Sequence, residues 1–146
     1  MLRGNHPAKV DEKGRLKIPA EFRAILEQKY GPDVYVTSVD GQSARIYPLR
    51  EWQAIESKLD QAPAMDPSKT RFIERTSYYG QAAALDRQGR ILIHGTLRES
   101  AAADGEVAVL GKLHYLEVWN HERFRRKLAE EPFTSDDLSR LASYGI

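Results

Sequence analysis

Two short segments of the chain carry an aspartate, a glycine and an arginine at the same spacing. They are Asp11-Glu12-Lys13-Gly14-Arg15 and Asp86-Arg87-Gln88-Gly89-Arg90. An aspartate that begins a four-residue turn can accept backbone N–H bonds across it, and a glycine at the end supplies the positive φ that other residues resist. The arginine that follows offers a fork of donors that matches a phosphate or the O6/N7 edge of guanine. Two such turns could present two guanidinium groups to a nucleic acid.

The same residue types also allow a structural role. An aspartate and an arginine that flank a tight turn can brace it, and surface ion pairs are nearly neutral in energy. For one turn, bracing is the simpler interpretation, and the second copy favours recognition. The second turn has only Arg87 nearby, with Gln88 and Leu92 where the first copy has lysines. The first hairpin is therefore the better candidate for a DNA contact. The further bases around it are Arg3, Lys9, Lys13 and Lys17.

The duplication extends beyond the two turns. At an offset of 75 residues, positions 10–23 and 85–98 share five identities in fourteen, the last of them Arg23 with Arg98. The similarity continues loosely from 34–36 to 107–109 and from 45–48 to 117–120. A repeat of this kind predicts two copies of one supersecondary unit. Since small units fold marginally alone, we expect the copies to share one core around a pseudo-two-fold axis in a mixed α+β domain.

Hydrophobic patterns predict the elements of each copy. Leu16 and Ile18 alternate with Lys17, which is typical of a half-buried strand. The helix that follows has Pro19 in its first turn and ends at Gly31-Pro32.

Each copy then ends on a helix with an aromatic residue near its start. Pro48 opens the first of these helices, which has Trp52 on its apolar face. Asn120 is the expected N-cap of the second, which has Phe124 and Leu128 one turn apart. We interpret both aromatic stripes as core and not as platforms for stacked bases.

The expected organisation is two repeats joined by a short connection. The first repeat covers 5–60, a linker with a bridging helix covers 61–78, and the second repeat covers 79–130. Residues 131–146 form a C-terminal helix or tail, which Thr134 or Ser135 would cap.

At these residues the chain resembles the MraZ family. The resemblance rests on the opening Met-Leu-Arg-Gly, on positions 10–23 and 85–93, and on their duplication at this spacing. It implies that both repeats are AbrB/SpoVT-like swapped-hairpin units. Two places depart from the pattern: His94 stands where a proline is expected, and Asn5-His6-Pro7 makes an unusual approach to the first hairpin.

The resemblance also implies a function. Members of the family are cytoplasmic, nucleoid-associated transcriptional regulators of the division and cell-wall gene cluster. They assemble into rings, octameric or larger, and bind short G-rich direct repeats in the double-stranded DNA of their own promoter. We expect this chain to be a repressor. Carried onto this chain, Arg15 is the leading DNA contact, with Arg3 and Lys13 beside it, and Arg90 is a weaker counterpart.

Composition sets the alternatives. The net charge is only +1, and there are no cysteines, so disulfides and zinc knuckles are excluded. No apolar run approaches the length of a membrane span, and the start has no signal-peptide core, which favours the cytoplasm. The four histidines belong to no catalytic or metal-binding motif, so we expect neither an enzyme nor a cofactor, metal or small-molecule substrate. The open alternative is an antitoxin-like interaction module with little DNA binding, gripping a protein through its C-terminal segment and exposed Trp and Tyr residues.

Overall fold

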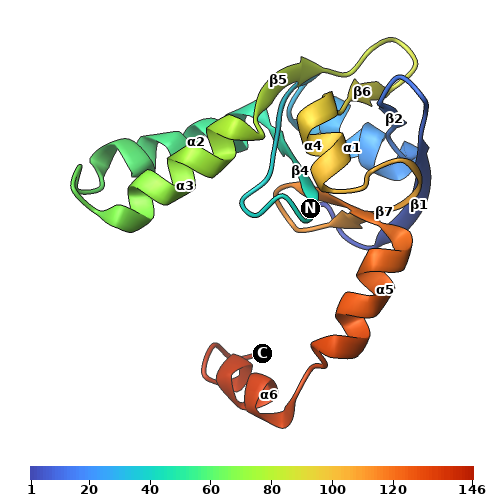
Figure 1. Ribbon diagram of the computed structural model, residues 1–146. Coiled ribbons are helices and arrows are strands. Elements are labelled where there is room, and N and C mark those ends of the chain that lie inside the picture. Colours follow the sequence, from blue (N-terminus) through green and yellow to red (C-terminus); the bar gives the residue numbers. More distant parts are fainter.

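Eight antiparallel strands form one nearly closed sheet in the computed structural model, which describes residues 1–146 (Figure 1). The strands are β1 (Asn5–Val10), β2 (Arg15–Lys17), β3 (Asp33–Thr37), β4 (Ala44–Pro48), β5 (Gln81–Ala84), β6 (Arg90–Leu92), β7 (Gly105–Gly111) and β8 (Leu116–Asn120). The helices are α1 (Ala20–Lys29), α2 (Leu49–Gln61), α3 (Pro67–Tyr78), α4 (Gly95–Ser100), α5 (His121–Glu130) and α6 (Ser135–Ala142). No helix combines the length and the apolar character that spanning a bilayer requires. The α+β class is as expected.

The strand order shows the internal symmetry. It runs β5-β3-β4-β8-β7-β1-β2-β6, and the two end strands are joined by the Asp86 turn. Exchanging β1–β4 with β5–β8 returns the same circular order, as a pseudo-two-fold axis requires. Each hairpin also pairs with strands of the other copy: β1 lies against β7, β5 against β3, and β2 against β6. The two copies are therefore interlocked swapped-hairpin units, which confirms the double-repeat fold.

The core belongs to both copies at once. A cluster of 19 buried residues contains Leu16 with its counterpart Ile91, and Phe22 with Leu97. Since the swapped strands carry the core side chains of each copy into the other, neither repeat has a complete apolar core of its own.

The predicted ends of α1 agree with the structure to within a residue. Pro19 and Pro48 are the N-caps of α1 and α2, one position before the first helical residue. Gly31, at φ +97°, ends α1 by donating its N–H to the Leu26 carbonyl. His94 also takes an extended cap conformation, at φ −68°, so α4 begins at the position equivalent to the start of α1 although the proline is absent. Its Nε2 donates to the Tyr79 carbonyl oxygen at 2.7 Å.

Two helical arms project from the sheet (Figure 1). The α2–α3 arm contains the predicted bridging helix, and its connection is shorter than the expected linker because α2 extends to Gln61 and α3 begins at Pro67. In the C-terminal arm, α5 and α6, Asn120 caps α5 and Thr134 forms a capping box on α6, as predicted.

The interpretation of Phe124 as core is wrong. No residue of α5 is buried; Phe124 is half-buried against Trp119, and Leu128 is 60% exposed. The reason is that α6 continues outward and does not fold back over α5. Trp52, by contrast, is buried as expected.

Candidate nucleic-acid interface

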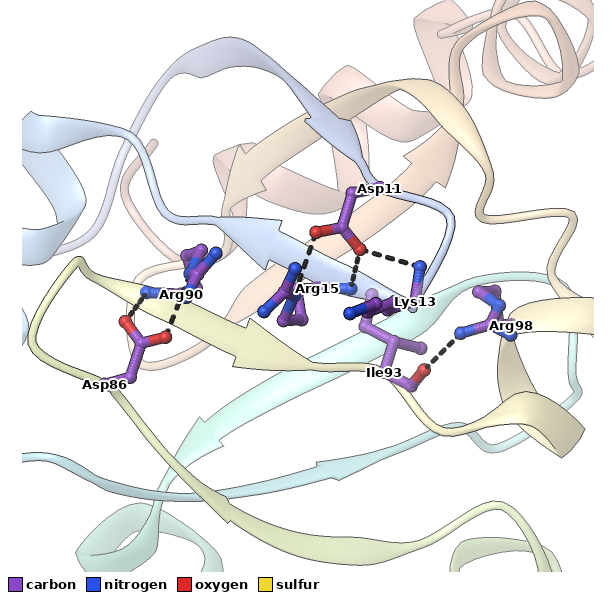
Figure 2. Close-up of polar contacts among 7 residues, drawn as sticks. All are labelled: Asp11, Lys13, Arg15, Asp86, Arg90, Ile93 and Arg98. Atoms are coloured by element: carbon purple, nitrogen blue, oxygen red, sulfur yellow. Dashed lines mark hydrogen bonds and ion pairs between the residues drawn. The ribbon is translucent and has the colours of Figure 1, made fainter.

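Both aspartates brace their turns in the same way (Figure 2). Asp11 Oδ1 accepts the backbone N–H groups of Lys13 and Arg15, each at 2.9 Å, and its Oδ2 accepts Arg15 Nε at 2.9 Å. In the second turn, Asp86 accepts the backbone of Gln88 at 2.8 Å and of Arg90 at 2.9 Å, with Arg90 Nε also at 2.9 Å. The repeated spacing is therefore a repeated geometry.

These hydrogen bonds hold both carboxylates ionised. The backbone N–H of Arg15 is the largest influence that lowers the pKa of Asp11, and the N–H of Arg90 does the same to the pKa of Asp86. Each aspartate contacts the guanidinium group only at Nε. The two terminal nitrogens of each arginine, Arg15 and Arg90, therefore donate to no protein group. One arginine can thus brace the turn and still offer its outer fork to a ligand.

The strands that follow the turns form a two-stranded ribbon, β2–β6. Its register places Leu16 opposite Ile91 at the centre, and both side chains are buried. Alternation along a strand turns the flanking residues to the outer face. Arg15 lies opposite Leu92, and Lys17 lies opposite Arg90. The ribbon therefore brings Arg15, Lys17 and Arg90 together on one surface.

The glycine of each turn is held by the other repeat. Gly14, at φ +84°, would meet Arg98 and the Ile93 carbonyl with any added Cβ, and Gly89, at φ +74°, would meet Arg23. Arg23 Nη2 also donates to the Arg87 carbonyl at 3.0 Å. The identity of Arg23 with Arg98 was visible in the repeat, yet the sequence alone assigned these residues no role; the structure makes them positioning residues for the two turns.

The other predicted bases lie at different distances from the ribbon. Lys13 is in the first turn, and Lys9 projects from β1, opposite Glu106 of β7. Arg3 lies beyond the far end of β1, where Leu2 pairs with Leu113. At a rise of about 3.3 Å per residue, Arg3 is on the order of 20 Å from Val10, so the structure does not bring it beside Arg15.

The surface made by the two turns and the ribbon is mildly basic. Its five bases outnumber its three acids: Lys13, Arg15, Lys17, Arg87 and Arg90 against Asp11, Glu12 and Asp86. The chain has no cluster of three or more His, Asp or Glu side chains that could hold a metal ion. The chemistry available here is hydrogen bonding to anionic or guanine-like acceptors.

Interlocked swapped hairpins and a doubled Asp-braced arginine define a double-repeat protein of the AbrB-like type. The family model described as "MraZ protein, putative antitoxin-like" matches residues 1–75 and 80–142. The chain belongs to the MraZ family.

Curated relatives agree over the whole length. Proteins named "Transcriptional regulator MraZ" are 49% identical over 146 residues in Acidobacterium capsulatum and 45% identical over 147 residues in Koribacter versatilis, each covering 100% of both chains. One with the same name in Marinomonas sp. is 36% identical over 139 residues, covering 94% of this chain and 90% of its own.

Proposed function

We propose that this protein is a non-catalytic transcriptional regulator that binds double-stranded DNA through the β2–β6 ribbon and its two turns. The observation that carries the proposal is the outer face of the ribbon, where Arg15, Lys17 and Arg90 lie together and both arginines keep their terminal nitrogens free. The family membership and the name of the relatives support it.

The proposed mechanism follows from the shape of the ribbon. The major groove admits a two-stranded β-ribbon, and arginine binds guanine O6 and N7 there through two hydrogen bonds. Because Asp11 already fixes Arg15, less rotamer entropy is lost when the guanidinium meets a base. Lys13, Lys17 and Lys9 would hold phosphates, which adds affinity without sequence preference.

Assembly into an oligomer would supply the DNA affinity that one weakly basic subunit lacks. Several ribbons on one ring-shaped homo-oligomer would engage tandem sites with a raised effective concentration. The exposed apolar side chains of the C-terminal arm, among them Phe133 at 67% and Leu138 at 57%, are the candidate subunit contacts.

We accordingly propose a cytoplasmic, nucleoid-associated repressor of the division and cell-wall genes that binds G-rich direct repeats. Its proposed units are repeats 5–60 and 79–130, the linker and bridging helix 61–78, and the C-terminal helix or tail 131–146.

The arm also favours a second candidate function, an antitoxin-like module whose partner is another protein. The tryptophans assigned to that role are not exposed, since Trp52 and Trp119 are 5% and 7% accessible. The exposed residues that remain for it are Tyr78, Tyr144 and the apolar side chains of the arm.

Fluorescence anisotropy tests the two functions directly. Wild type, Arg15→Ala and the control Arg71→Ala, an exposed change on α3, are titrated against a G-rich tandem-repeat duplex and a scrambled one at two salt concentrations. We expect Arg15→Ala to lose about 1–3 kcal/mol per site and most sequence preference, and Arg71→Ala to behave as wild type. A folded, assembled wild type that binds neither duplex would rule out the regulator and leave the protein-partner function.

A further inference from the structure

Leu92 is the one apolar side chain on the outer face of the β2–β6 ribbon. It is 50% exposed, whereas its strand neighbour Ile91 is buried, and it lies directly opposite Arg15. The other outward residues of the ribbon are basic: Arg15, Lys17 and Arg90. Phosphates offer nothing to a leucine at this position.

The internal repeat shows that the leucine is not required by the fold. At the offset of 75 residues, Leu92 corresponds to Lys17, which occupies the same place on β2 that Leu92 has on β6. Both positions point outward and belong to matching strand pairs, so either residue is compatible with the backbone. The difference must therefore be explained by what the outer face meets.

The base edges of the major groove offer one apolar group, the 5-methyl group of thymine. Residues directly opposite on an antiparallel pair have Cβ atoms about 4.5–5.5 Å apart, and base pairs are stacked about 3.4 Å apart. A base reached by Leu92 is thus on the same base pair as the guanine reached by Arg15 or on one next to it. The minor groove carries no methyl group, so this contact also selects the groove.

We propose that Leu92 is a specificity-determining residue that packs against the methyl group of a thymine adjacent to the guanine bound by Arg15. This proposal rests on the proposed DNA-binding function and adds that the ribbon binds DNA in one preferred orientation. With a lysine at both positions, the four outward residues of the ribbon would be the same after rotation about its pseudo-two-fold axis, and only the turns, with Lys13 against Gln88, would distinguish the two orientations on DNA. Leu92 on one side and Lys17 on the other extend this asymmetry to the ribbon itself, in keeping with binding to direct repeats.

The test uses the thymine methyl group as the probe. A duplex is first selected from random sequences by binding to the wild-type protein, and each of its thymines is then replaced in turn by deoxyuridine, which lacks only the methyl group. Anisotropy titrations compare wild type, Leu92→Ala, Leu92→Lys and the control Leu113→Ala, a 54% exposed leucine at the β7–β8 hairpin.

We expect wild type and Leu113→Ala to lose about fourfold in affinity at one thymine, the amount that one buried methyl group contributes. The guanine bound by Arg15 is the one whose replacement does not lower the affinity of Arg15→Ala. The thymine lies within one base pair of that guanine. Leu92→Ala binds the thymine and uracil duplexes equally. Leu92→Lys also loses the thymine preference, but binds all duplexes more tightly with a steeper salt dependence.

Two results would overturn the proposal while leaving the proposed function intact. One is wild-type affinity that no uracil replacement changes; the other is an equal loss in wild type and Leu92→Ala, which would assign the methyl group to another residue. A wild type that selects no duplex would overturn both together. Because Leu92 is exposed, Leu92→Ala is expected to fold, and circular dichroism of each variant verifies this.

Discussion

The first and second turns have the same backbone and different surroundings. Both use an aspartate with three hydrogen bonds, a glycine at positive φ and an arginine held through Nε. Outside that shared frame, Lys13 and Lys17 of the first copy are replaced by Gln88 and Leu92. The motif itself is accounted for by the turn, so its presence alone does not locate a binding site. Only the residues that differ between the copies can make the two turns bind a ligand differently.

The helical arms differ in the same informative way. Trp52 of α2 and Phe124 of α5 hold equivalent places, but Trp52 stacks on Tyr35 at 4.8 Å and lies 6.4 Å from Phe72 of α3. Phe124 has only Trp119, at 5.3 Å, because α6 does not cover α5. The first arm therefore buries its aromatic side chain within the chain, whereas the second arm leaves Phe124 partly exposed.

The largest effect is expected from removing these two aromatic side chains. Trp52→Ala should lower the free energy of unfolding by about 3–5 kcal/mol, as for other large buried aromatics. Phe124→Ala should lower it by about 1 kcal/mol, because its ring is only partly buried. Urea unfolding at low protein concentration measures both. Equal losses would mean that Phe124 is covered in solution, either by α6 or by another copy.

The turn glycines come next. Gly14→Ala forces a Cβ onto a positive φ and within 2.7 Å of the Ile93 carbonyl, so a loss of about 2–4 kcal/mol is expected. Gly89→Ala meets only the flexible Arg23 side chain, at 2.8 Å, and should lose about 1–2 kcal/mol. Gly31→Ala, with open space around it, provides the cost of the positive φ alone. If Gly89→Ala lowered the free energy of unfolding more than Gly14→Ala does, the contacts assigned between each turn and the other repeat would be wrong.

Much of the fold was predictable because it depends on local chemistry. The turns, the cap at Asn120, the end of α1 at Gly31 and the shared core follow from residue types and spacing, and the repeat supplied the symmetry. The fate of Phe124 was not predictable, because whether a helix folds back depends on contacts that no local pattern encodes. The same holds for Arg3, which is close to the first turn in sequence and is separated from it by the length of β1.

Acid should affect the two turns equally. Both aspartates have a pKa below the usual value of 3.8, so their stabilising contribution is present above about pH 4 and is lost as the pH falls through the lowered value. Asp11→Asn and Asp86→Asn should each flatten the decline of the urea midpoint as the pH falls below about 4. Glu12→Gln serves as the control, because the Glu12 carboxylate lies in the first turn and forms no hydrogen bond there. Unequal flattening would show that the two braces differ in strength.

The smallest effect separates stability from binding. Lys17 lies directly opposite Arg90, and like charges at such positions destabilise a strand pair. Lys17→Leu gives the first copy the residue of the second and removes this repulsion, so the unfolding free energy should rise by about 0.2–1 kcal/mol. DNA affinity should fall equally for all sequences, with a salt slope shallower by about one, because a phosphate contact is lost. A variant that is more stable and binds less well would show that the lysine is present for the ligand; unchanged DNA binding would place the phosphate contacts elsewhere and leave the two copies functionally alike at this position.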